Sequence, residues 1–369
     1  MYFDLNDTQR QIKETAHGFL TSKYRSERVR ELLDSEQGFE ESDWKEMAEL
    51  GWAGLALPEE HGGLGLGAVE LAVVFEEIGY SIVPTPLLST TIAGLALAAG
   101  GSEEQREAYL APLAEGTRRG TVALWDEGTQ ARIGEWTMEA RTSGDGVVLD
   151  GAKVLVLDAA SADFMLVATS DGRRHIVPTD ADGVTIAREE SIDLTRRFHT
   201  VRFDGVEVPA ERTLPAEGDA YWPVFGRVCV ALSAELTGIA QRCLEMSVAY
   251  AGERQQFGRP IGAYQAVSHR CASMLMGAEN SRSLTYYAAW AADAEPDSLQ
   301  RAASMAKAYA SDAGWHVAHE AIQVHGGIGF TWEHDLHLYL KRARVDAALF
   351  GDARWHRERV AEGALAVAA

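Results

Sequence analysis

The sequence predicts an α+β protein of three parts: an N-terminal helical domain at residues 1–118, a middle antiparallel β domain at 119–216 and a C-terminal four-helix bundle at 217–369. Apolar residues recur at helical spacing in the first part, short β-rich runs follow one another in the middle, and long helical segments fill the last part. A chain of 369 residues with 46% hydrophobic content is long enough to bury cores for these domains.

The first part is predicted to be helical, with one glycine-rich interruption. Apolar positions such as Ile12 and Ala16 fall on one face of a helix. The stretch LALPEEHGGLGLG (55–67) contains Pro58 and four glycines, which forbid a continuous helix. We therefore expect a loop there, followed by a helix at Val69–Ile78.

The middle part contains closely spaced strand patterns. Glycine and aspartate separate the β-rich runs, and no helical pattern lies between them. This spacing indicates an antiparallel sandwich or barrel. The expected strands are Val147–Leu149, Val154–Leu157, Phe164–Ala168, His175–Val177, Val184–Ala187 and Val201–Val208.

The last part is predicted to be a four-helix bundle with three connecting loops. Turn-forming and helix-breaking residues concentrate in the loops, which are FGRPIG (257–262), ADAEPD (292–297) and HGGIGFTWEHD (325–335). Between them the helical pattern continues over long stretches. These helices are expected near 222–253, 262–292, 297–324 and 334–365.

Charge and composition argue against several classes of function. The net charge is −21, with 55 acidic against 34 basic residues, so no nucleic-acid or anionic-membrane surface is expected. The sequence shows no apolar run of membrane-spanning length and no secretory signal, which predicts a cytoplasmic protein. The cysteines, Cys229, Cys243 and Cys271, lie in apolar helical stretches and are expected to be buried thiols. His316 and His319 do not form an H-E-x-x-H pattern, and we expect no metal site.

Four segments resemble signatures of the acyl-CoA dehydrogenase family, and they cover almost the whole chain. WKEMAELGWAGLALPEEHGGLG (44–65) with FEEIG (75–79) resembles the N-terminal pattern, and FDGVEVP (203–209) resembles the exit from the β domain. RQQFGRPIGAYQ (254–265) resembles the family's Arg-x-x-Phe-Gly-x-x-Ile-x-x-x-Gln segment, and QVHGGIGFTWE (323–333) resembles its Gln-x-x-Gly-Gly-x-Gly loop. The family also has the predicted order of helical domain, β domain and bundle.

Residues in the last two segments are suited to a dinucleotide. Arg254 supplies a fixed cation for a diphosphate, and Gln265 offers both a donor and an acceptor. Gly326 and Gly327 let backbone N–H groups approach a phosphate without obstruction by a Cβ atom. The resemblance implies that these segments reach the ADP end of an FAD seated in a neighbouring subunit. The implied cofactor residues are Arg254, Phe257, Gln265, Gln323, Gly326 and Gly327.

The resemblance fails at both positions where the family keeps its catalytic base. The base removes an α-proton beside the thioester carbonyl, so a carboxylate must lie within hydrogen-bond reach of that proton. In this sequence the commoner position falls on Phe350 and the alternative position on Val228, and both are apolar. The nearby carboxylates Asp352 and Glu235 are interpreted as surface or salt-bridge residues.

The β domain also departs from the family pattern. The resemblance places the segments that hold the flavin ring at ALWDEGTQARI (123–133) and AKVLVLDA (152–159). The second segment offers only apolar side chains at Val154–Leu157, where the family has an aromatic residue and a hydroxyl. Trp125 could stack on a flavin, but a core or interface position is favoured.

These departures predict a division of labour between subunits. The elements lost serve a subunit's own flavin ring and substrate, whereas the elements kept reach a neighbour's cofactor. We therefore expect FAD to be shared across an interface with a homologous catalytic acyl-CoA dehydrogenase subunit, in a heterotetramer acting on an acyl-CoA. By analogy with paired actinobacterial members of the family, the substrate is expected to be a bulky steroid-derived CoA thioester.

Two alternatives remain open at this point. The chain could be an active homo-oligomeric dehydrogenase in which a shifted helix brings Asp352 or Glu358 inward as the base. That alternative predicts full flavin loading by this chain alone. The chain could instead be a structural or CoA-binding scaffold without redox function, which predicts no flavin even when every natural partner is present.

Overall fold

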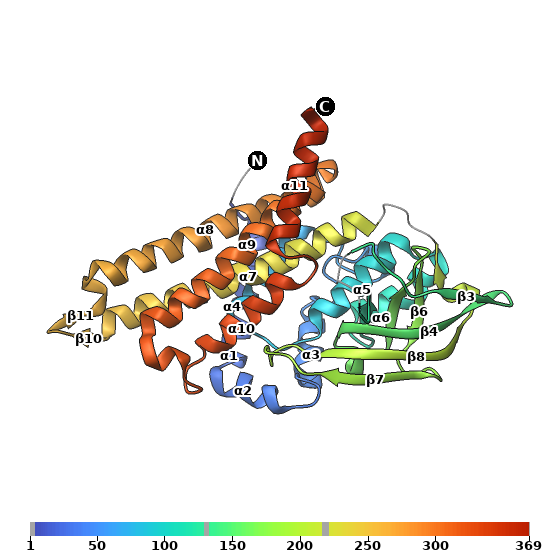
Figure 1. Cartoon of the computed structure of the whole chain (residues 1–369), viewed down its shortest axis with the longest axis horizontal. Coiled ribbons are helices and arrows are strands. Elements are labelled where there is room, and N and C mark those ends of the chain that lie inside the picture. Colours follow the sequence, from blue (N-terminus) through green and yellow to red (C-terminus); the bar gives the residue numbers. More distant parts are fainter. Residues whose placement is uncertain (1–3, 129–132, 216–220, 369) are drawn as a thin grey trace. The chain divides into compact units, whose positions relative to one another are not determined.

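The computed structural model describes residues 4–128, 133–215 and 221–368, and it confirms the order of helical, β and helical parts (Figure 1). The chain forms two compact units. Unit 1 comprises Met1–Glu31, Ala68–Val83 and Gly226–Ala369, and unit 2 comprises Leu32–Gly67 and Pro84–Phe225. The predicted limit at residue 216 lies outside the described residues, and the limits of the three domains stay a prediction.

Unit 1 is a helical bundle, and its long helices run side by side (Figure 1). A short β-hairpin joins the two helices α7 and α8, and a 3₁₀-helix, η6, follows α9. The elements are α1 (Asp7–Lys23), α2 (Ser26–Asp34, which continues into unit 2), α4 (Ala68–Tyr80), α7 (Tyr221–Glu253, which begins in unit 2), β10 (Gln255–Gln256), β11 (Arg259–Pro260), η5 (Ile261–Ala263), α8 (Gln265–Ala294), α9 (Pro296–His325), η6 (Gly326–Phe330), α10 (Leu336–Ala348) and α11 (Ala353–Ala368).

The prediction of one continuous last helix is wrong, because the chain breaks between α10 and α11. Phe350 and Gly351 have φ angles of +56° and +98°, which no α-helix accommodates. A Cβ atom on Gly351 would lie 2.7 Å from the Trp355 ring, so glycine is required there. The apolar periodicity continues across the break, and for that reason the sequence suggested a single helix.

Helix α7 is the buried centre of the bundle. It is long and apolar enough to cross a membrane, but 89% of its most apolar stretch is buried inside the protein. Gly79 of α4 and Gly238 of α7 allow the two backbones to touch, since a Cβ atom on either would lie about 2.0 or 1.9 Å from a carbonyl oxygen of the other helix. Two of the three cysteines, Cys229 and Cys243, are buried as expected, whereas Cys271 is only half-buried.

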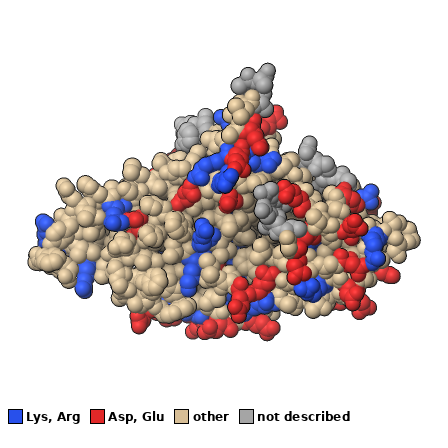
Figure 2. Space-filling view, in the orientation of Figure 1, with Lys and Arg blue, Asp and Glu red and all other residues tan. Residues whose placement is uncertain are grey.

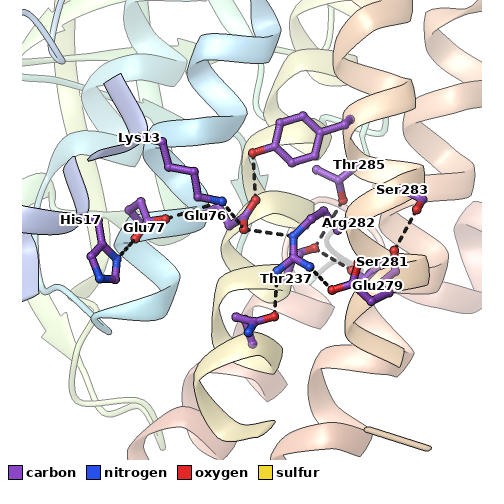
Figure 3. A network of polar contacts seen from close by, with 12 residues as sticks. Lys13, His17, Glu76, Glu77, Thr237, Glu279, Ser281, Arg282, Ser283 and Thr285 are labelled. Carbon is purple, nitrogen blue, oxygen red and sulfur yellow. Dashed lines mark hydrogen bonds and ion pairs between the residues drawn. The ribbon is translucent and has the colours of Figure 1, made fainter. Parts of the chain in front are cut away.

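A polar network fixes α1, α4 and α8 around this centre (Figure 3). The carboxylate of Glu76 accepts hydrogen bonds from Lys13 Nζ at 3.0 Å, Arg282 Nε at 3.2 Å and Tyr286 OH at 2.9 Å. Burial by itself would raise the pKa of Glu76, but Lys13 and Arg282 outweigh burial, and the pKa is lowered. The buried carboxylate is therefore ionised and paired with both cations.

Unit 2 combines helices with two β-sheets (Figure 1). Strands β1, β5, β6 and β9 form one sheet in that order, and β2, β4, β8 and β7 form the other, where β3 also pairs with β4. Apolar residues of both sheets, including Leu149, Val167 and Val201, pack into one core. The elements are α3 (Glu41–Glu49), η1 (Glu59–His61), α5 (Leu87–Gly100), α6 (Glu103–Ala114), β1 (Gly120–Ala123), β2 (Trp125–Asp126), β3 (Ala140–Ser143), β4 (Gly146–Leu157), η2 (Ala159–Ser161), β5 (Phe164–Ala168), β6 (Arg174–Pro178), β7 (Val184–Glu189), β8 (Phe198–Val208), η3 (Ala210–Arg212) and β9 (Thr213–Leu214).

The β domain differs from the prediction in the pairing of its strands and in the extent of one of them. β1 and β5 pair in parallel, so the domain is not entirely antiparallel. The strands expected at Val147–Leu149 and Val154–Leu157 are one long strand, β4, which is irregular where Gly151 has a φ of +131°. The glycine suggested a turn, but it serves a bulge within a continuous strand.

Candidate functional site

The first predicted cofactor segment forms the hairpin at the tip of α7 and α8. Phe257 and Gly258 are its two central residues, with φ angles of +52° and +80°, as a type I′ turn requires. Phenylalanine is an uncommon choice for a left-handed position, and here its side chain is 93% exposed. Arg254 and Gln265 flank the hairpin and are both exposed. A strained, exposed aromatic residue at a turn is more typical of a binding contact than of a packed core.

The second predicted segment lies at the end of α9. Gln323, Gly326 and Gly327 are exposed, and Gly326 has a φ of +65°. A Cβ atom built on either glycine would meet no atom within 4 Å. Open space in front of two glycines lets a phosphate approach the backbone N–H groups, so the site fits the group that the sequence predicted.

One contact that the sequence did not reveal brings the two segments together. The ring of Tyr250, one helical turn before Arg254, stacks on the ring of His325, which directly precedes Gly326, with a centroid distance of 4.4 Å. Tyr250 and His325 belong to α7 and α9, and only the tertiary fold makes them neighbours. The structure thus gathers both halves of the predicted cofactor site at one end of the bundle.

The charge at this end suits an anion. From Arg254 to Ala278 the sequence contains three arginines and no aspartate or glutamate, although the chain as a whole has a net charge of −21. Glu253 precedes this stretch and Arg270 is paired with Glu320, so Arg254 and Arg259 are the cations that remain for a ligand. On the face drawn in Figure 2, the outermost end of unit 1, where Figure 1 places β10 and β11, shows basic and uncharged side chains. Such a local excess of cations attracts a diphosphate even in an acidic protein.

The same end exposes large apolar side chains. Phe257 is joined by three residues of the loop after α9, namely Ile328 at 47%, Phe330 at 77% and Trp332 at 60% exposure. Exposed apolar residues grouped on neighbouring loops mark surfaces that another molecule covers. The sequence did not predict this surface, but Phe330 and Trp332 stand close together in a loop and are the signal that could have suggested it.

The two positions expected for a catalytic base lie in the interior of unit 1. Val228 of α7 is 2% exposed and Phe350, between α10 and α11, is 3% exposed. They belong to one neighbourhood, because His356 Nε2 lies 3.1 Å from the Phe350 carbonyl oxygen and 4.0 Å from the sulfur of Cys229, which follows Val228. The side chain of Phe350 is therefore buried in the interior of unit 1.

The nearby carboxylates have structural roles in this arrangement. Asp352 is exposed and accepts the backbone N–H of Trp355 at 2.8 Å, at the start of α11. Glu358 pairs on the surface with Arg354 at 3.0 Å. Glu235 is buried and paired with Arg342, whose Nε donates to Oε1 at 2.8 Å.

Buried basic groups hold the break that contains Phe350. Lys307 Nζ donates to Ser311 Oγ and to the carbonyl oxygens of Ala347 and Gly351, each at 3.2 Å. Burial lowers the pKa of Lys307 to about 8. Burial, together with the positive charge of Lys307, lowers the pKa of His356 to about 3, so this imidazole is neutral and its Nε2–H donates to Phe350.

In unit 2, the stretch expected to hold a flavin ring presents apolar side chains. Leu155 has a φ of +54°, and Val156 and Leu157 are buried. Trp125 is 4% exposed and lies opposite Val154 in the β2–β4 pair, as expected for a core residue. The other predicted stretch, 123–133, extends over residues 129–132, which lie outside the described residues.

Comparison with known proteins identifies the family. The model of the acyl-CoA dehydrogenase N-terminal domain matches residues 6–117, and the model of the C-terminal domain matches residues 224–365. The chain belongs to the acyl-CoA dehydrogenase family. It is 33% identical to the acyl-CoA dehydrogenase IpdE2 of Mycolicibacterium smegmatis over 96% of this chain and 98% of the relative.

Solved structures of paired acyl-CoA dehydrogenases are similar to this chain. The Tcur3481–Tcur3483 steroid ACAD matches with a TM-score of 0.88 and 32% identity, over 98% of this chain and 99% of the matched chain. The ChsE4–ChsE5 complex of Mycobacterium tuberculosis matches with a TM-score of 0.89 and 28% identity, over 98% of both chains. These likenesses confirm the predicted fold.

The pKa of His356 predicts how this acyl-CoA dehydrogenase chain responds to acid. Its folded-state pKa of about 3 lies below the ordinary histidine value of 6.5, so the unfolded chain binds the proton first as pH falls. Stability contributed by the neutral imidazole is complete above pH 6.5 and is lost as pH falls towards 3. We expect His356→Asn to reduce the difference in unfolding free energy between pH 7 and pH 4 by about 3 kcal/mol.

Urea unfolding of both proteins across that pH range measures the effect. The exposed His319→Asn variant controls for removal of one histidine from the bundle. If the unfolding free energy of His356→Asn still fell as much between pH 7 and pH 4 as that of the unmodified chain, His356 would not be the group that couples folding to pH.

Proposed function

We propose that this chain is the non-catalytic subunit of a heterotetrameric, FAD-dependent acyl-CoA dehydrogenase, in which it completes the FAD site of a homologous catalytic subunit. The observation that carries the proposal is a contrast between two sites. The residues suited to the ADP end of FAD are exposed at one end of the bundle, where large apolar side chains are also exposed. Both base positions, by contrast, hold buried apolar side chains, Phe350 and Val228.

In this assembly the chain binds and orients the cofactor. Arg254 pairs with the diphosphate, Gln265 and Gln323 donate to and accept from the nucleotide, and the backbone at Gly326 and Gly327 approaches a phosphate. The chemistry that FAD supplies in this family is acceptance of hydride during α,β-desaturation of an acyl-CoA thioester. The partner subunit contributes the carboxylate that removes the α-proton, because no carboxylate occupies either position here.

A steroid-derived CoA thioester is the substrate class that we propose. The Tcur3481–Tcur3483 relative is a steroid ACAD, and it matches this chain at 32% identity over nearly its whole length. In the proposed assembly this chain takes no substrate of its own, since the position of Phe350 is buried, and the partner subunit takes the bulky ring system.

The geometry disfavours the active homo-oligomer. That alternative requires Asp352 or Glu358 to turn inward, but Asp352 caps α11 from the surface and Glu358 pairs with Arg354. Moving Asp352 inward would leave the Trp355 N–H without its cap. The scaffold alternative does not account for the open space in front of Gly326 and Gly327, which a purely structural surface does not need.

FAD content and native mass test the proposal. The chain is purified alone and after co-expression with a homologous acyl-CoA dehydrogenase that keeps a glutamate at the position of Phe350. We expect little FAD in the chain alone and one FAD per pair of unlike subunits in a mixed complex. One FAD per chain in a homo-oligomer would contradict the proposal, and a mixed complex without FAD would favour the scaffold.

A further inference from the structure

A separate cleft of about 420 Å³ lies within unit 1, and we propose that it binds a compact organic phosphate, a phosphate monoester with an apolar or aromatic body. The cleft is bordered by α1, the start of α2, the end of α4, α7 and the start of α10. None of the six residues assigned to FAD lines it, so the proposal does not rest on the proposed function.

The charge of the cleft favours an anion with more than one negative charge. Its lining, all within the described part of the chain, contains two guanidinium groups, Arg25 and Arg242, and a single carboxylate, Asp335. Asp335 is already neutralised by Arg30 at 2.6 Å and accepts a hydrogen bond from Ser26 at 2.7 Å. The Arg25 side chain is exposed and has no ion pair with any residue that the structure describes. The cleft therefore has a local excess of cations in a chain of net charge −21.

The cleft contains a polar group that a ligand would satisfy. Ser81 lines it and is 6% exposed, yet its hydroxyl has no hydrogen-bond partner among the described residues. Buried hydroxyl groups are nearly always paired, so an unpaired one calls for a missing partner. A phosphoryl oxygen would accept the Ser81 O–H.

The backbone next to Ser81 is strained. Ile82 ends α4 with a φ of +48°, and its N–H and that of Val83 bond back to Gly79 and Ile78 in a Schellman motif. Glycine normally occupies this position, and a β-branched residue there is an outlier. The motif directs Tyr80 and Ser81 into the cleft wall, where Tyr339 OH donates to the Tyr80 carbonyl oxygen at 3.0 Å. Strain of this kind concentrates at binding sites.

Size and lining specify an organic phosphate. A carboxylate has one charge and two oxygens, whereas a phosphate monoester has three terminal oxygens and nearly two charges to match Arg25 and Arg242. The volume of about 420 Å³ falls in the range of small-molecule sites and exceeds what a free phosphate fills. The rings of Tyr24, Tyr80 and Tyr339 border the remaining space and suit an apolar body.

His17 adds a polar contact without competing for the ligand. Its Nδ1 is engaged by Glu77 at 2.8 Å, as Figure 3 shows, and its ring packs against Tyr80 at 5.1 Å. Arg242 also lies over the Tyr80 ring, 5.3 Å from its centroid. Tyr80 is therefore held between His17 and Arg242, and the cleft wall is preorganised before a ligand arrives.

Calorimetric titration of the purified chain with phenyl phosphate tests the proposal. We expect saturable binding that Arg25→Gln weakens roughly tenfold or more and that Ser81→Ala also weakens, because each loses a contact with the phosphoryl group. Arg354→Gln, which removes another exposed arginine, from α11, is the control and should bind as the unmodified chain does. Arg25 is exposed and Ser81 is unpaired, so neither change threatens folding.

Four outcomes would overturn the proposal. In the first, phenyl phosphate does not bind saturably, and in the second, Arg25→Gln leaves its affinity unchanged. In the third, benzoate binds as tightly as phenyl phosphate, and in the fourth, inorganic phosphate does. The third would point to a carboxylate and the fourth to free phosphate. Weaker binding of both competitors, together with the losses in the two variants, would support an organic phosphate.

Discussion

Replacing Arg254 by alanine is expected to strip FAD from the mixed complex. The arginine is exposed beside the hairpin of α7 and α8, and its side chain makes no hydrogen bond or ion pair with the residues that the structure describes. A hydrogen bond between charged groups contributes about 1.5–3 kcal/mol, so the loss should weaken FAD binding roughly ten- to hundredfold. Flavin absorbance per complex after gel filtration, followed by titration with FAD, measures the change.

Arg259→Ala is the matched control for this experiment. Arg259 is exposed in the same hairpin, where its guanidinium lies over the Tyr264 ring at 4.0 Å, and it is not one of the residues assigned to FAD. Arg259→Ala should therefore keep its flavin. Native mass spectrometry separates loss of FAD from loss of assembly, since the Arg254 variant should remain a mixed complex. Equal flavin content in both variants would contradict a contact between Arg254 and FAD.

Most of the fold was predictable because its elements have strong periodic patterns. β5 has the predicted limits, Phe164–Ala168, and α7 begins one residue earlier than predicted. The strands of the two larger sheets that the sequence missed are β1, β2, β3 and β9, which are two to four residues long. Runs this short are too brief to show an alternation of apolar and polar residues. Parallel pairing of β1 with β5 depends on contacts distant in sequence, which no local pattern records.

The sequence motifs selected the residues of the candidate site, but they did not reveal how those residues are arranged. The motifs singled out Arg254 and Gly326, whereas the stacking of Tyr250 on His325 that joins them exists only in the folded chain. The position of Lys307 was likewise not predictable from the sequence. A lysine in a helix is normally solvated, and only the packing of α9 against α10 and α11 shows that this one is buried and holds the break at Gly351.

Replacing Arg342 by leucine is expected to destabilise unit 1 strongly. Arg342 of α10 is 1% exposed, donates to Glu235 of α7 and lies 3.5 Å from Asp346. Removing the cation leaves two carboxylates buried without it, and breaking a buried pair in this way costs about 3–5 kcal/mol. Urea unfolding of the variant at neutral pH measures the loss. Arg354→Leu, which breaks a surface pair, should cost at most about 1 kcal/mol.

A second variant identifies the cause of that loss. In Arg342→Leu combined with Glu235→Gln, one of the carboxylates that lost the arginine is neutral, so part of the stability should return. If the double variant were no more stable than Arg342→Leu, lost packing and not the buried negative charge would be responsible. The distinction bears on function, because Glu235 lies two helical turns beyond Val228 and Arg342 lies two turns before Phe350. The pair thus joins α7, which bears Val228, to α10, which leads into the break that contains Phe350.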